Sequence, residues 1–155
     1  MNIGELQVGD FVYYCKANQY VTRVIDIRTY GDEYAITCIR DDRDPLKEKY
    51  KEDLFNVAIL HPIPITSEIL EKNGFIKDGY TNLSPDYYLN DKDFNIYVNL
   101  RSTCDKTAQI WCENRNTKHI ASYEISRHAL IDKTLYIHQL QQLLRSCKIN
   151  KDIVL

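Results

Sequence analysis

Residues 94–101 read Phe-Asn-Ile-Tyr-Val-Asn-Leu-Arg, and apolar and polar side chains alternate along this stretch. A period of two is typical of a β-strand with one buried face. The sequence Ala-Gln-Ile-Trp-Cys-Glu at residues 108–113 alternates in the same way. Placing the apolar residues of both stretches on one face predicts that the two strands form a hairpin, and it fixes which residues lie opposite each other. The predicted opposing pairs are Ile96 with Cys112, Val98 with Ile110, Tyr97 with Trp111, and Asn99 with Gln109.

A third strand, at about Lys118–Ile125, is expected to complete this sheet, and a helix is expected on each side of it in the sequence. The first helix begins at Thr66 or Ser67, whose hydroxyl can accept a backbone N–H, and ends at Gly74. The second helix, Leu135–Cys147, has apolar residues three and four apart. The tail after residue 148 is apolar enough for a further strand.

Short β-strands are predicted before residue 62, at 6–14, 20–27, 33–40 and 54–60, with a charged loop at 41–53. The sequence Val-Gly-Asp-Phe-Val at 8–12 is a turn that leads into the first strand. This meander resembles a small barrel of the Src-homology or Tudor type, in which such a turn commonly opens the first strand.

The predicted fold class is therefore α+β. A small barrel-like β meander is followed by an antiparallel sheet with two short helices. We expect a barrel module at residues 1–62 and the sheet with its helices at residues 63–155, packed together as one unit.

Composition excludes several classes of protein. The formal net charge is −2, from 20 basic and 22 acidic residues, and no basic run is present, so nucleic-acid binding is not expected. No apolar run approaches the ~18 residues of a membrane span, and the polar N-terminus does not predict a signal peptide. The five cysteines include no Cys-x-x-Cys pair, which predicts free and mostly buried thiols in a reducing cytosol.

The sequence contains no signature of catalysis or of a cofactor. Its four histidines form no zinc-binding pattern, and it lacks the motifs of serine hydrolases, P-loops and dinucleotide sites. We therefore expect no metal, no cofactor and no enzymatic activity.

The outer face of the predicted hairpin is unusual for a solvated sheet, because it is rich in amides and aromatic rings instead of Lys, Glu and Thr. This composition favours a contact surface or a pocket that orients a ligand by hydrogen bonds. The alternative is that a helix or the N-terminal module packs on this face and buries Trp111. The candidate ligand-binding residues are Tyr97, Asn99, Arg101, Gln109 and Trp111.

The polar side of the last predicted helix lacks Lys, Glu and Asp from residue 135 to residue 145. Neutral amides with one arginine suit an interface or a buried polar network better than open water. A surface stripe that arose by chance is the alternative. The candidate interface residues are His138, Gln139, Gln142 and Arg145.

Two stretches carry a family resemblance. Residues 63–75 read Ile-Pro-Ile-Thr-Ser-Glu-Ile-Leu-Glu-Lys-Asn-Gly-Phe, and residues 136–147 read Tyr-Ile-His-Gln-Leu-Gln-Gln-Leu-Leu-Arg-Ser-Cys, followed by Lys-Asp-Ile-Val-Leu at 151–155. Both resemble short proteins encoded by prophages and mobile elements of gut Bacteroidota, with Ile137 in place of the usual Val. The resemblance runs over the whole length and transfers no functional residue. It implies an accessory role and a cytoplasmic location in the bacterial host.

Two functions from different classes follow from these patterns. The first is a non-catalytic protein that binds and sequesters a small nucleotide-derived ligand in counter-defence, as a homo-oligomer. The second is a protein–protein adaptor that uses the N-terminal barrel, with Tyr13, Tyr14, Tyr20 and Tyr30 as contact residues. An enzyme of unrecognised type is the third alternative.

Overall fold

The computed structural model divides the chain into two compact units, Met1–Ile63 and Pro64–Leu155. The candidate ligand residue Arg101 and the predicted loop at 41–53 lie outside the described residues, except that Asp53 begins a strand. The residues that the structure describes are 6–14, 20–30, 33–40, 53–55, 60–78, 85–100, 108–125 and 134–155.

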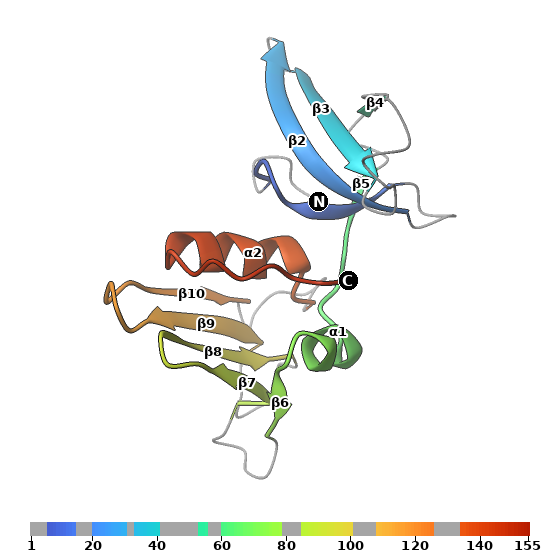
Figure 1. Ribbon diagram of the computed structural model, residues 1–155. Coiled ribbons are helices and arrows are strands. Elements are labelled where there is room, and N and C mark those ends of the chain that lie inside the picture. Colours follow the sequence, from blue (N-terminus) through green and yellow to red (C-terminus); the bar gives the residue numbers. More distant parts are fainter. Residues whose placement is uncertain are drawn as a thin grey trace, which may run out of the picture. The chain divides into compact units, whose positions relative to one another are not determined.

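The first unit contains one antiparallel sheet with the strand order β4-β3-β2-β1-β5 (Figure 1). Its strands are β1 (Phe11–Tyr14), β2 (Tyr20–Tyr30), β3 (Glu33–Arg40), β4 (Asp53–Phe55) and β5 (Leu60–Pro62). The predicted meander is present, but β4 and β5 are the two edges of the sheet. Within the described residues the sheet therefore stays open and does not close into a barrel.

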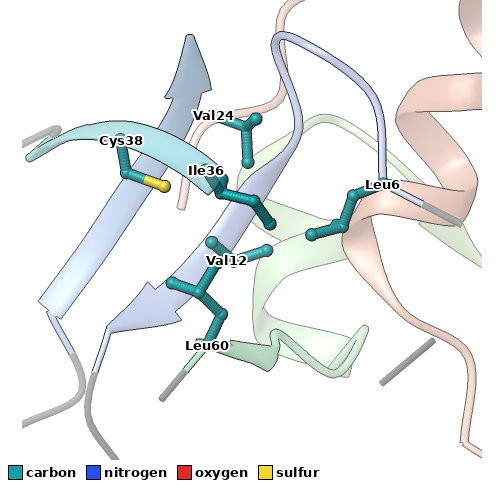
Figure 2. Packing of buried hydrophobic residues seen from close by; sticks show 6 residues of the cluster. All are labelled: Leu6, Val12, Val24, Ile36, Cys38 and Leu60. Carbon is teal, nitrogen blue, oxygen red and sulfur yellow. The ribbon is translucent and has the colours of Figure 1, made fainter. Parts of the chain in front are cut away.

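A small apolar cluster holds this first sheet together (Figure 2). Residues from four of its strands and from the segment before β1 meet there: Leu6, Val12, Val24, Ile36, Cys38 and Leu60. The predicted turn before β1 is also present, because Gly9 has a φ of 95° and donates its N–H to the carbonyl of Val24 at 2.7 Å. A positive φ is accessible to glycine at little cost, which explains why the turn forms there.

The second unit contains an antiparallel sheet with the order β10-β9-β8-β7-β6 and two helices (Figure 1). The sheet consists of β6 (Ile76–Lys77), β7 (Tyr87–Asn90), β8 (Phe94–Asn99), β9 (Gln109–Asn114) and β10 (Ile120–Glu124), and the helices are α1 (Ser67–Lys72) and α2 (Ile137–Ser146). The predicted register is confirmed, since all four expected pairs between β8 and β9 are present.

Both helices belong to the face of this sheet that carries Ile96 and Val98, called the inner face below. The Sγ of Cys147, just after α2, lies 3.4 Å from the carbonyl oxygen of Cys112 on β9. The hydroxyl of Tyr87 on β7 lies 3.5 Å from Oε1 of Glu71 in α1. The opposite, outer face of the sheet therefore receives neither helix.

The ends of the helices follow their sequence signals. Thr66 is the N-cap of α1, and its Oγ1 accepts the N–H of Ile69 at 3.3 Å. Gly74 takes a φ of 82° just beyond the helix. The predicted α+β class, with an N-terminal meander and a second sheet with two helices, is confirmed. Within the described residues, neither helix has the length and apolar content that crossing a membrane requires.

The tail after α2 is not a strand. Instead, the side chain of Asn73 binds it as a strand would, because its Nδ2 donates to the carbonyl of Val154 at 2.8 Å and its Oδ1 accepts the N–H of Val154 at 2.9 Å. One amide side chain thus satisfies both backbone groups of a residue 81 positions away.

Candidate functional site

The centre of the outer face is a pair of aromatic rings. The register places Tyr97 of β8 directly opposite Trp111 of β9. Their ring centroids lie 5.2 Å apart and their planes are inclined by 42°, within the usual range for a favourable aromatic pair. Both side chains are half-buried. The pair therefore forms one apolar platform with part of its surface open.

A hollow of about 310 Å³ lies beside this platform. Three of its lining residues, Asn99, Gln109 and Pro85, join the two rings. Four of the five residues expected to bind a ligand thus line one hollow, and the fifth, Arg101, lies outside the described residues. The alternative in which the C-terminal helix covers Trp111 is wrong, because α2 packs on the inner face.

Asn99, which lines this hollow, is held in place by the segment that leads into β7. Its Oδ1 accepts the backbone N–H of Asp86 at 3.1 Å, and the side chain is only 9% exposed. In return, Oδ2 of Asp86 accepts the backbone N–H of Leu100 at 2.9 Å. The first of these hydrogen bonds fixes the orientation of the Asn99 amide, and the second holds Asp86 in place.

The other polar groups of the hollow are less constrained. Within the described part of the chain, no hydrogen bond is made by the Gln109 amide, the Trp111 indole N–H, the Tyr97 hydroxyl or the Nδ2 of Asn99. Gln109 lies directly across from Asn99 in the ladder. Two amides on adjacent strands can therefore present hydrogen-bonding groups to one ligand beside an aromatic platform.

The described charges near the hollow are acidic. The carboxylate of Asp86 accepts the N–H of Leu100, the residue after Asn99, and the exposed Glu124 lies opposite Gln109 on β10. Neither carboxylate would attract a phosphate group. Any positive charge for a phosphorylated ligand must come from elsewhere, and Arg101, two positions after Asn99, is the nearest arginine in the sequence.

Asn95, on the same face of β8 as Tyr97 and Asn99, has a structural role. Its Nδ2 donates to Oε2 of Glu113 at 3.0 Å, while its Oδ1 accepts a hydrogen bond from Arg115. Both ends of this amide are occupied. Asn95 therefore braces β8 against β9 and does not line the hollow.

The candidate interface residues on α2 differ in exposure. His138 is 1% exposed and stacks on Tyr136 with ring centroids 5.8 Å apart. Gln139 is buried, and its Oε1 accepts the N–H of Tyr136 at 2.9 Å, which caps the start of α2. Gln142 is half-buried and Arg145 is exposed. Helix capping thus accounts for one of the uncharged residues of the stripe, and self-association at the other positions stays a prediction.

Three cysteines in the described residues are free and buried, namely Cys38, Cys112 and Cys147. Burial raises the pKa of Cys38 to about 11 and, with the neighbouring Cys147, that of Cys112 to about 12. Thiols with such pKa values are not nucleophiles at neutral pH. Within the described residues, no three metal-ligating side chains gather in one place.

The tyrosines expected to serve an adaptor lie in the first unit. Tyr14 is half-buried and packs against the apolar cluster of that unit. Tyr13 is half-buried, and the side chains of Tyr20 and Tyr30 lie outside the described residues. Tyr14 therefore has a structural role within the first unit.

Sequence reasoning missed Pro85 and Asp86. Their position between an irregular stretch and the short strand β7 gives them no periodic pattern, and their partner Asn99 is 13 residues away. The Ser-Pro-Asp sequence at 84–86 indicates a turn but does not reveal that the backbone of Asp86 orients the Asn99 amide. Comparison with protein-family models, curated proteins and solved structures found no match to this chain.

Proposed function

We propose that this chain is a non-catalytic protein that binds a small nucleotide-derived ligand in the hollow on the outer face of β8 and β9. The observation that carries the proposal is the joining of a Trp–Tyr platform and two amides in one hollow. Aromatic faces stack bases, and amides form hydrogen bonds with base edges.

The ring geometry defines how a base would stack. A planar group inserted between two rings needs a ring separation of about 7 Å, because each aromatic contact takes about 3.5 Å. The separation of 5.2 Å between Tyr97 and Trp111 is too short for that. A base would therefore lie on the open side of the pair, in contact with both rings, and its edge would face the amides.

The size of the hollow limits the ligand. About 310 Å³ lies at the low end of the range of about 300–1,000 Å³ for small-molecule sites. The hollow therefore suits one base with its sugar. With acidic groups at Asp86 and Glu124, a phosphate would extend away from them, and we assign its recognition to Arg101.

The biological role that we propose is sequestration of a nucleotide signal by a phage or mobile-element protein in the cytoplasm of its bacterial host. The support is the resemblance of the two helix sequences to accessory proteins of such elements. A protein that captures a ligand needs no catalytic group. Native mass spectrometry of protein purified from its natural host tests this role, because a sequestering protein retains its ligand as an added mass.

Replacing Trp111 with Ala should weaken ligand binding about ten- to hundredfold, because stacking one base contributes roughly 1–3 kcal/mol. Isothermal calorimetry with the ligand found by mass spectrometry measures the effect. Tyr88→Ala is the matched control, since Tyr88 lies opposite Tyr97 in the ladder but does not line the hollow. Unchanged affinity per folded molecule together with a large loss of thermal stability would show that Trp111 is only a packing residue.

We further propose that the chain assembles as a homo-oligomer through the accessible part of the α2 stripe, Gln142 and Arg145, since His138 and Gln139 are buried within their own unit. Of these, Gln142 is the best position to test, because its side chain is half-buried and Gln139 is needed for helix capping. Gln142→Glu places a charge on the stripe and should lower the molecular mass seen by light scattering, with unchanged circular dichroism. An equal mass for both proteins would contradict the assembly.

A further inference from the structure

We infer that Asn99 acts only as a hydrogen-bond donor to the ligand, so that the bound base must present an acceptor atom to it. This inference rests on the proposed function and specifies the chemistry of the same site. It names Asn99 as a specificity-determining residue, in contrast to Gln109 across from it.

The first step is the orientation of the Asn99 amide. A backbone N–H can only donate, so the Asn99 atom that faces the N–H of Asp86 must be the oxygen. The Asp86 carboxylate in turn accepts the N–H of Leu100, which holds the donor segment in place.

The second step is the cost of the opposite orientation. Turning the amide by 180° would place the Asn99 NH₂ group against the N–H of Asp86. Two donors would then face each other at a side chain that is only 9% exposed. A buried donor without an acceptor is strongly disfavoured, so the NH₂ group stays on the side of the hollow.

The third step is the contrast with Gln109. Within the described residues, no hydrogen bond restrains its amide, so Gln109 can rotate to donate or to accept. Bases offer an acceptor beside a donor on their pairing edges, such as a keto oxygen beside a ring N–H. The acceptor would face Asn99 and the neighbouring donor would face the Gln109 oxygen.

Calorimetry with neutral nucleosides tests this inference without a contribution from phosphate charge. Inosine carries acceptors on its six-membered ring, and benzimidazole riboside has C–H groups in their place. The unmodified protein should bind inosine about ten- to hundredfold more tightly, because benzimidazole riboside offers neither an acceptor to Asn99 nor an N–H to Gln109. This comparison needs no variant and so does not depend on the folding of one.

The test variant is Asn99→Asp, and Tyr88→Ala, at a residue that does not line the hollow, is its control. Asn99→Asp keeps an oxygen for the N–H of Asp86 but replaces the donor by an acceptor, so inosine should bind about ten- to hundredfold more weakly. The preference for inosine over benzimidazole riboside should then decrease to the part that Gln109 contributes. Tyr88→Ala leaves the lining of the hollow intact and should change inosine binding by less than about threefold.

The binding results distinguish a failure of the donor role of Asn99 from a failure of the proposed binding function. Equal binding of inosine and benzimidazole riboside by the unmodified protein would overturn the donor role of Asn99, while the binding function would stand. An equal loss in Asn99→Asp and Tyr88→Ala would also overturn it. Binding of neither nucleoside, and of no nucleotide, would overturn the proposed function itself.

Discussion

Asn95 and Asn99 lie on the same face of β8 and have the same side chain, yet their surroundings give them different tasks. Asn95 has charged neighbours in Glu113 and Arg115, which occupy both ends of its amide. Asn99 meets a backbone N–H at one end and the hollow at the other. The strand period predicts that both point outward, but only tertiary contacts decide which amide remains available to a ligand.

Cys112 gives a prediction about alkaline pH. Burial, with the nearby Cys147, raises its pKa to about 12, so the folded protein keeps the thiol neutral where the unfolded chain ionises at its ordinary pKa of 9.0. The contribution of the neutral Cys112 thiol to the free energy of unfolding is complete below pH 9 and is lost as the pH rises from 9 to 12. At pH 10 this loss is about 1 kcal/mol. Urea denaturation at pH 8 and pH 10 should show a smaller decrease for Cys112→Ala than for the unmodified protein.

Equal decreases for the two proteins would mean that Cys112 ionises at the same pH in the folded and unfolded states. Alkylation gives an independent readout, because a buried neutral thiol should react only after unfolding.

At the scale of elements, the sequence predicts most of the second unit. Alternation along residues 94–99 and 109–113 is strict enough to predict which side chains face each other, and this register is present. Thr66 and Gly74 mark the ends of α1 correctly, because caps are local chemistry. The tail was predicted less well, since its apolar residues suited a strand while its backbone bonds go to the side chain of Asn73.

Asn73→Ala should detach this tail from α1. The substitution removes the two hydrogen bonds to Val154 and one from Nδ2 to the carbonyl of Ile69 at 2.7 Å. We expect a loss of about 1–3 kcal/mol in the free energy of unfolding, because partly buried backbone groups lose their partners. Hydrogen exchange should also become faster at the Val154 amide. Asn150→Ala, at an exposed position, is the control, and unchanged exchange at Val154 would contradict the role of Asn73.

At the scale of the whole molecule, composition and periodicity are enough to predict the α+β class. They also predict which face of the second sheet is amide-rich. They do not predict whether that face is covered, because this depends on which side of the sheet the helices take. They do not reveal the Pro85–Asp86 segment either, since its contacts with Asn99 and Leu100 join residues 13 and 14 positions apart.

The central claim is that the outer face of β8 and β9 binds a nucleotide-derived ligand, and the chain provides its own probe for it. Trp111 is the only tryptophan in the sequence and lines the hollow. Its fluorescence should change on titration with nucleosides and nucleotides and should reach saturation, because a base stacked on the indole alters its surroundings. Unchanged emission across the whole panel, with no heat of binding in calorimetry, would contradict the claim.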